Sequence, residues 1–267
     1  MIATDDAIEL EAERLLKALL HVDCDPRHRT WNLDTCRSIA PLTLEINRLK
    51  QEKDAVILTH SYVEPEIIYG VGDFKGDSYF LSLKARESRA KMIVFAGVVF
   101  MAETAKILSP DATVVVPDRG SGCSLADSLT GDQLRKLKAA YPDAAVVCYI
   151  NSTADVKAES DVCVTSGNVY DIIARLPERR ILFVPDRLMG QNIRDELKRR
   201  GIDKELITIA NTGNFDLAIV GIGRNPRLGR FATSTSRYST QVTVEELCVR
   251  IKALPQRMEP VPLRIEP

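Results

Sequence analysis

The feature that most constrains the fold of this chain is an alternation of short apolar segments with amphipathic ones between residues 55 and 190. The apolar segments are rich in valine and isoleucine, which suits strands that are buried on both faces of a parallel sheet. Strands that alternate with helices predict an α/β fold, in which small parallel sheets carry helices on both faces. The predicted strands are Ala55–Leu58, Met92–Phe95, Val114–Val116, Ala145–Ile150, Val162–Val164 and Ile181–Val184.

The alternation contains an internal repeat. A stretch from Gly97 through a helix to Pro117-Asp118 aligns with a stretch from Gly167 through a helix to Pro185-Asp186, with glycine-to-proline spacings of 20 and 18 residues. Two unrelated strand–helix units would explain the strands, but they would not readily explain a Pro-Asp pair in both copies. The sequence therefore predicts a duplicated αβα unit.

These patterns divide the chain into four predicted parts. Residues 1–53 form an N-terminal helical extension, with amphipathic helices at 1–22 and 39–53 and a connector at 23–37. Residues 54–118 form the first αβα repeat, and residues 119–190 form the second. Residues 191–267 read as a degenerate third repeat that ends in a C-terminal helix, with predicted elements at Asn192–Arg200, Leu206–Ala210, Leu217–Val220 and Val244–Leu254.

Composition excludes several classes of function. The formal net charge of -1 gives no electrostatic basis for binding nucleic acid or an anionic membrane. No apolar run reaches membrane-spanning length, and no N-terminal signal pattern is present, so we expect a cytoplasmic protein. The six cysteines form no Cys-x-x-Cys pair, and a chain of 267 residues is too long for a disulfide scaffold. Two of them, Cys148 and Cys163, lie inside predicted strands and are interpreted as core packing.

Polar side chains gather where predicted strands end. His60 and Tyr62 follow the first strand, Asn151 follows the fourth, and Ser166 follows the fifth, with Tyr149 beside a strand end. Ligands of parallel α/β sheets bind outside the carboxyl ends of the strands. These residues are therefore candidates to line a shared cavity, although a lone histidine at a strand end can also be a hydrogen-bonded structural residue.

Cys123 lies on a glycine-rich turn between Gly120 and Gly122 on one side and Ser124 on the other. The sequence predicts that a helix opens just after it, and the positive end of a helix favours a thiolate. Cys123 is therefore a candidate metal ligand or nucleophile. The alternative is a small apolar residue in a tight loop.

Residues from about 55 to 190 resemble the first two domains of quinolinate synthases. Several blocks carry the resemblance in the same order: Val56–Tyr62, Gly76–Ser78, Val94–Lys106, Pro117–Asp127, Tyr149–Lys157, Thr165–Asn168 and Pro185-Asp186. The resemblance implies three related αβα domains in a pseudo-threefold arrangement around a central cavity. It also implies a 4Fe-4S cluster held by three cysteines, one from each domain, with the fourth iron position open to substrate.

The resemblance further implies the reaction and the residues that serve it. Quinolinate synthases condense iminoaspartate with dihydroxyacetone phosphate to give quinolinate for NAD biosynthesis, which implies a functional link to L-aspartate oxidase. By this match His60 and Tyr62 are catalytic, since both side chains can donate and accept protons. Cys123 is the first cluster ligand. Substrate-binding roles fall to Ser78, Tyr149, Asn151, Ser166, Ser234 and Thr235.

The chain departs from the family pattern after Pro185-Asp186. The second cluster cysteine, with the histidine and glutamate that follow it, is missing there, and so is the late third cysteine; Cys248 lies inside a predicted helix. One cysteine does not hold a 4Fe-4S cluster, because such clusters need several thiolates. Two interpretations follow: a divergent synthase with an altered third domain, or a cluster-free homologue that binds or transforms a related small anionic metabolite, or is inactive.

Overall fold

The computed structural model describes residues 4–22 and 31–209. The described residues form two compact units, divided between Arg119 and Gly120, and each unit is described by itself. No helix in this part of the chain is long and apolar enough to cross a membrane. Four of the predicted features lie outside the described residues: Leu217–Val220, Ser234, Thr235 and Val244–Leu254.

The first unit begins with two packed helices, α1 (Asp5–Leu19) and α2 (Leu33–Glu52). Helix α2 starts inside the predicted connector, because the side chain of Asn32 accepts a hydrogen bond from the backbone N–H of Thr35 (2.8 Å) and caps the helix. Apolar residues of both helices form a separate small core. Helix α2 also packs on the sheet through Ile46 and Leu49, so it belongs to the helical layer of this unit.

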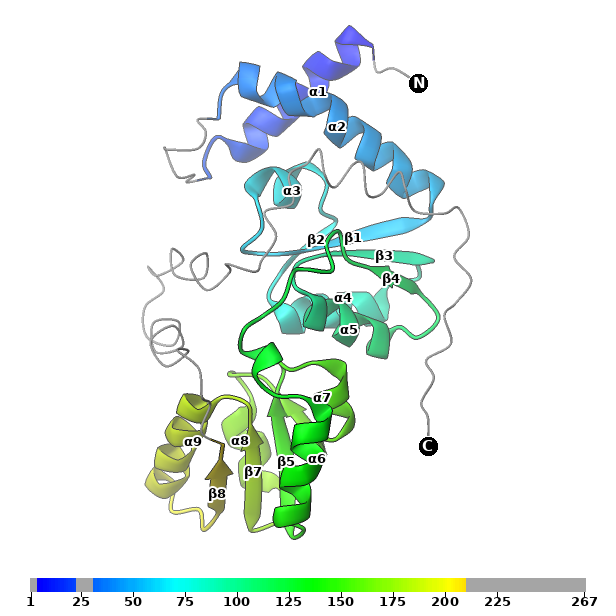
Figure 1. The fold of residues 1–267 in the computed structure, drawn as a ribbon. Coiled ribbons are helices and arrows are strands. Elements are labelled where there is room, and N and C mark those ends of the chain that lie inside the picture. Colours follow the sequence, from blue (N-terminus) through cyan, green and yellow to red (C-terminus); the bar gives the residue numbers. More distant parts are fainter. Residues whose placement is uncertain (1–3, 23–30, 210–267) are drawn as a thin grey trace. The chain divides into compact units, whose positions relative to one another are not determined.

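The first unit holds a four-stranded parallel sheet in the order β2-β1-β3-β4. Helices α2 and α3 (Pro65–Gly70) cover one face, and α4 (Ser78–Glu87) and α5 (Val99–Leu108) cover the other (Figure 1). The strands are β1 (Ala55–His60), β2 (Phe74–Gly76), β3 (Met92–Ala96) and β4 (Thr113–Val115). The sequence did not predict β2, because this three-residue edge strand is exposed and lacks an apolar pattern.

The second unit has the same architecture, with the strand order β6-β5-β7-β8 (Figure 1). Helices α6 (Gly131–Ala140) and α7 (Ala154–Ala158) pack on one face through Leu134 and Val156. Helices α8 (Val169–Arg175) and α9 (Arg187–Arg199) pack on the other through Ile173 and Ile193. The strands are β5 (Ala144–Tyr149), β6 (Val162–Val164), β7 (Arg180–Val184) and β8 (Glu205–Thr208).

The α/β fold with parallel sheets is thus confirmed, and the two units repeat one topology. One pair of hydrogen bonds fixes the equivalence: the N–H of Asp73 donates to Ile57 O (2.9 Å), and the Asp73 carboxylate accepts from Ile57 N (2.8 Å). Asp161 makes the same two bonds to Val146, at 2.9 and 2.8 Å. These four residues mark equivalent positions.

The alignment of the repeat made from the sequence is wrong by one strand. It treated β3 and β4 as equivalent to β6 and β7. The strand orders of the two sheets instead make β3 equivalent to β7 and β2 equivalent to β6. The alignment was based on the Pro-Asp motif, which lies at different places in the two units. Pro117-Asp118 follows β4, the fourth strand of the first unit in chain order, whereas Pro185-Asp186 follows β7, the third strand of the second unit. Residues 191–208, assigned above to the third repeat, contribute most of α9 and all of β8 to the second unit.

Candidate functional site

Each unit places three of the predicted site residues at the carboxyl edge of its sheet. His60 ends β1, Tyr62 lies two residues further, and Ser78 opens α4 after β2. In the second unit, Tyr149 ends β5, Asn151 lies two residues further, and Ser166 follows β6. The repeat makes these residues equivalent in pairs: His60 with Tyr149, Tyr62 with Asn151, and Ser78 with Ser166.

His60 and Tyr62 form the most developed part of the first edge. Their ring centroids lie 3.9 Å apart at an interplanar angle of 37°. The Tyr62 hydroxyl donates a weak hydrogen bond to the sulfur of Met101 in α5, at 3.8 Å. The Nδ1 atom of His60 is buried and has no hydrogen-bond partner among the described residues. A buried polar atom of this kind calls for a partner, and a bound ligand can supply one.

The imidazole of His60 is held in its neutral form. Burial lowers the pKa of His60 from 6.5 to about 4, and the nearby negative charge of Asp77 only partly opposes this effect. A neutral histidine at physiological pH can accept a proton, and the tyrosine beside it can donate one. The pair therefore offers a bound substrate one acceptor and one donor, and a negatively charged substrate would raise the pKa of His60 toward the range in which it transfers protons.

Ser78 is placed by a helix cap. The Asp77 carboxylate accepts a hydrogen bond from Phe80 N (2.8 Å), which begins α4 with Ser78 as its first residue. The parallel register sets Gly76 beside His60, so Asp77 and Ser78 follow directly beyond the histidine. The Ser78 side chain is half-buried. A hydroxyl in this position can bind an oxygen of an anionic ligand.

The equivalent edge of the second unit is polar and more open. Tyr149 and Asn151 are half-buried, and Ser166 is exposed. The backbone carbonyl of Tyr149 accepts a hydrogen bond from the hydroxyl of Ser152 (2.8 Å). The loop that holds Ser166 is closed by a hydrogen bond from Thr165 N to the side chain of Asn168 (2.7 Å). This edge offers hydroxyl and amide groups rather than an acid–base pair.

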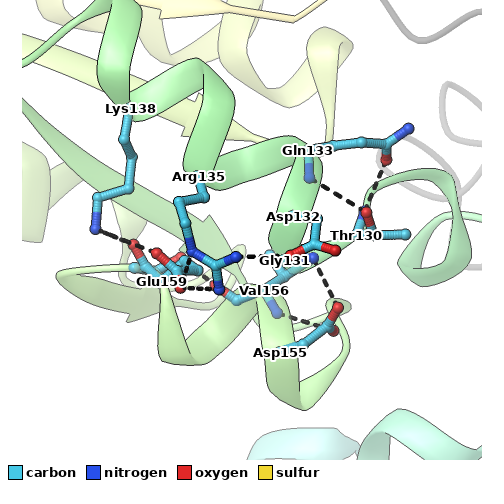
Figure 2. A network of polar contacts seen from close by, with 10 residues as sticks. Thr130, Gly131, Asp132, Gln133, Arg135, Lys138, Asp155, Val156 and Glu159 are labelled. Carbon is cyan, nitrogen blue, oxygen red and sulfur yellow. Dashed lines mark hydrogen bonds and ion pairs between the residues drawn. The ribbon is translucent and has the colours of Figure 1, made fainter. Parts of the chain in front are cut away.

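A polar network fixes the loop after β5 (Figure 2). The Asp155 carboxylate accepts hydrogen bonds from Gly131 N (2.6 Å) and Val156 N (2.9 Å), and it also binds the Thr153 hydroxyl. Arg135 of α6 binds Asp132 (2.6 Å) and Glu159 (2.7 Å), so α6 is tied to the end of α7. The network anchors the segment that follows Asn151.

Cys123 lies in a tight loop, but not at the start of an α-helix. Only a single 3-10 turn, Ala126–Ser128, follows it, and α6 starts later at Gly131. Burial raises the pKa of the Cys123 thiol, although the backbone N–H groups of Ala126 and Leu125 oppose the rise. The expectation that a helix terminus favours the thiolate is therefore wrong. Deprotonation at neutral pH would need a stronger positive charge, such as a metal ion.

The described residues do not complete an iron–sulfur site. Within residues 4–22 and 31–209, no three His, Cys, Asp or Glu side chains lie together as metal ligands do. Cys36 is buried in the α1–α2 core, while Cys148 and Cys163 lie in the second sheet. Cys24 and Cys248 lie outside the described residues. A 4Fe-4S cluster needs several thiolates, so the described chain supplies at most one of its ligands at Cys123.

The sequence indicated a helix cap at Gly76–Ser78, but it did not assign Asp77 or Met101 a role in the site. Asp77 is the charged group that acts on His60, and the Met101 sulfur accepts a weak hydrogen bond from the Tyr62 hydroxyl. Recognising β2 would have revealed Asp77, because a parallel neighbour of β1 must end beside His60. No local signal indicates the contact of Met101, which depends on how α5 packs.

Comparisons with known proteins agree with the resemblance noted above. The family model described as "NadA: Quinolinate synthetase A protein" matches residues 44–214. The quinolinate synthase of Caulobacter vibrioides (strain NA1000 / CB15N) is 49% identical over 158 residues, which are 58% of this chain and 43% of that protein. The quinolinate synthase of Mycobacterium sp. (strain KMS) is 54% identical over 151 residues, 56% of this chain and 44% of that protein.

A third relative shows the same pattern of coverage. The quinolinate synthase of Clostridium perfringens (strain ATCC 13124) is 53% identical over 152 residues, 57% of this chain and 50% of that protein. The chain thus spans about half the length of the curated relatives that it matches.

Proposed function

Because this chain belongs to the quinolinate synthase family, we propose that it condenses iminoaspartate with dihydroxyacetone phosphate to give quinolinate for NAD biosynthesis. The observation that carries the proposal is His60, a neutral histidine whose buried Nδ1 has no partner among the described residues and whose ring lies against Tyr62. The reaction removes and returns protons beside a carbonyl or imine as phosphate and two waters leave. A neutral histidine and a tyrosine suit those proton transfers.

The remaining site residues bind and position substrate in this proposal. Ser78, Asn151 and Ser166 hold carboxylate or phosphate oxygens through hydroxyl and amide groups. Tyr149 lines the pocket, and Ser234 and Thr235, outside the described residues, extend the set of hydroxyl ligands. We also propose a functional link to L-aspartate oxidase as the source of iminoaspartate.

Family membership implies a 4Fe-4S cluster, and we propose Cys123 as one of its ligands. The loop around Cys123 is tight and half-buried, which suits a thiolate that is held by a metal. When bound, a cluster with an open iron supplies Lewis-acid chemistry. The other ligands are not among the described thiols, so no step of the reaction is derived from the cluster.

The finer fold assignment is also a proposal. A degenerate third repeat that follows β8 would complete a pseudo-threefold arrangement around a central cavity. The repetition of one strand order in two units supports the principle of this arrangement.

A second function is favoured by a specific observation. The strand ends of both units carry hydroxyl, amide and imidazole groups, which can bind an anion by hydrogen bonds without a metal. A cluster-free homologue that binds a small anionic metabolite at these strand ends fits this combination.

One set of measurements on the full chain separates the two functions. The chain is expressed anaerobically, its iron and sulfide are measured, and quinolinate formation is assayed with dihydroxyacetone phosphate and iminoaspartate generated by L-aspartate oxidase. We expect quinolinate to form. We also expect His60→Gln and Tyr62→Phe to lower kcat by roughly 10²–10⁴-fold, the usual contribution of an acid–base group.

Control variants test whether Cys123 binds iron and distinguish the synthase function from the binding function. Cys123→Ser is expected to lose the bound iron and its visible absorbance, whereas Cys36→Ala, which changes a thiol in the α1–α2 core, is expected to keep both. Absence of both quinolinate and iron would contradict the synthase proposal. A thermal shift of the same preparation with dihydroxyacetone phosphate, reduced by Ser78→Ala, would then support the binding function.

A further inference from the structure

The second sheet contains a close pair of thiols that the proposed reaction does not use. Cys148 of β5 and Cys163 of β6 are direct register partners on adjacent parallel strands. Their Sγ atoms lie 3.1 Å apart and share a hydrogen bond. Both are free thiols in the structure. The pair is therefore fixed by the sheet itself rather than by a loop.

The two thiols differ in their access to solvent. Cys148 is fully buried, and it packs in the apolar core beneath α6 and α7 with Val156 and Leu182. Cys163 is exposed, because β6 is the edge strand of the sheet. The prediction that both residues are core packing is therefore wrong for Cys163. One thiol can meet a reagent from solution, and the other lies directly behind it.

The two thiols also differ in acidity. The pKa of Cys163 is lowered to about 7, chiefly by the hydrogen bond that its sulfur shares with Cys148, with a further contribution from the charge of Lys157. The same hydrogen bond, together with burial, raises the pKa of Cys148. At neutral pH the thiol of Cys163 is therefore ionised to a greater extent than an ordinary cysteine thiol, whose pKa is about 8.5. The exposed thiol is the nucleophile of the pair.

We propose that Cys148 and Cys163 form a reversible dithiol–disulfide site that exchanges with small-molecule disulfides. The Cys163 thiolate attacks one sulfur of the oxidant, which forms a mixed disulfide and releases one thiolate. The released thiolate takes the proton of Cys148, whose sulfur then attacks Cys163 Sγ and displaces the second thiolate. One protein thiolate, one protein thiol and one small disulfide thus become one protein disulfide, one small thiol and one small thiolate.

The sheet geometry allows this bond. Neighbouring strands lie roughly 4.8 Å apart, within the span of Cα separations that a disulfide bridges. The Sγ atoms must close from 3.1 Å to a bond length of about 2.05 Å, a shift that side-chain rotation at an edge strand can supply. The bridge would tie β5 to β6 just before Tyr149 and three residues before Ser166. It would thus brace the polar edge of the second unit.

Equilibration of the folded, reduced full chain with defined ratios of reduced and oxidised glutathione tests the proposal. After acid quenching, alkylation and digestion, mass spectrometry is expected to find peptides that join Cys148 to Cys163, and an excess of reduced glutathione is expected to reverse the link. In the reduced chain at pH 7, iodoacetamide is expected to modify Cys163 at least 10-fold faster than Cys36. Phenylarsine oxide, which chelates paired thiols, is expected to block the linkage.

Single substitutions separate the roles of the two thiols. Cys148→Ser should leave Cys163 trapped as the glutathione mixed disulfide, and Cys163→Ser should leave Cys148 unmodified. Cys36→Ala is the matched control and should change neither result. Melting temperatures confirm that each variant is folded. The proposal is overturned if the link forms only in urea, if the wild-type mixed disulfide on Cys163 never resolves, or if both thiols stay reduced in excess oxidised glutathione.

Discussion

At the scale of single residues, equivalent positions of the two repeats carry side chains with different chemical properties. His60 and Tyr149 occupy the same place at the end of the first strand of each unit, and Tyr62 and Asn151 share the next polar place. The sequence identified all four residues, because a polar side chain after an apolar strand is a local pattern. The neutral state of His60 was not predictable in this way, since it results from burial by residues distant in the sequence.

The depressed pKa of His60 predicts a pH dependence of stability. Between pH 6.5 and about 4 the unfolded chain binds a proton at His60 and the folded chain does not, so this contribution to stability is present above pH 6.5 and is lost as the pH falls toward 4. The loss is at most about 1.4 kcal/mol per pH unit. Urea unfolding at several pH values should show a shallower slope for His60→Gln than for wild type.

The exposed His21 supplies the matched control for that measurement. His21→Gln should leave the slope of unfolding free energy against pH close to that of wild type. Nuclear magnetic resonance of the imidazole carbons should place the His60 titration near pH 4. A His60 titration near 6.5, with equal slopes in both variants, would contradict the burial argument.

At the scale of elements, small residues decide how closely helices approach strands. A Cβ atom on Gly190 of α9 would lie 2.2 Å from Thr208 Cγ2 of β8 and 3.3 Å from the ring of Phe183. The glycine therefore allows α9 to rest directly on the sheet, although glycine is a poor helix former. The sequence predicted this helix and strand, but not the contact between them.

Gly190→Ala is expected to destabilise the chain by about 1–3 kcal/mol, despite the better helix propensity of alanine, because the new methyl group overlaps Thr208. Thr208→Ser removes Cγ2 and should restore much of that loss in the double variant, which equilibrium unfolding of all four chains would reveal as a coupling energy. Gly167→Ala, whose Cβ would have its nearest neighbour at 3.9 Å, is the control and should have little effect. If the losses of unfolding free energy in the two single variants simply add in the double variant, overlap with Thr208 is not the cause of the destabilisation.

At the scale of the whole molecule, each unit has hydrophobic cores of its own. In the first unit, α1, α2 and α3 pack with one another and with β1 and β3, and α4 and α5 bury further apolar residues such as Leu81 and Phe100. The cores of the second unit are built from helices α6 to α9 and strands β5 to β8. The family match runs across both units, from residue 44 to residue 214.

Separate cores predict that damage to one unit is local. Hydrogen exchange of the Gly190→Ala chain should be faster in β5, β7 and β8, because the substitution disturbs the core that contains them. Exchange in β1 and β3 should match that of wild type. Equal acceleration in both sets of strands, measured on peptides by mass spectrometry, would refute this prediction.

The sequence by itself determined the α/β class, most strands, the family and the polar residues at the strand ends, because strand burial and turn chemistry are local and leave short-range patterns. Tertiary structure decided what depends on contacts between distant segments. It set the register of the repeat, which the shared Pro-Asp motif obscured, and the exposed edge strand β2, which has no apolar pattern. It also decided the neutral charge of His60 and the pairing of Cys148 with Cys163, since both arise only where separate strands and helices meet.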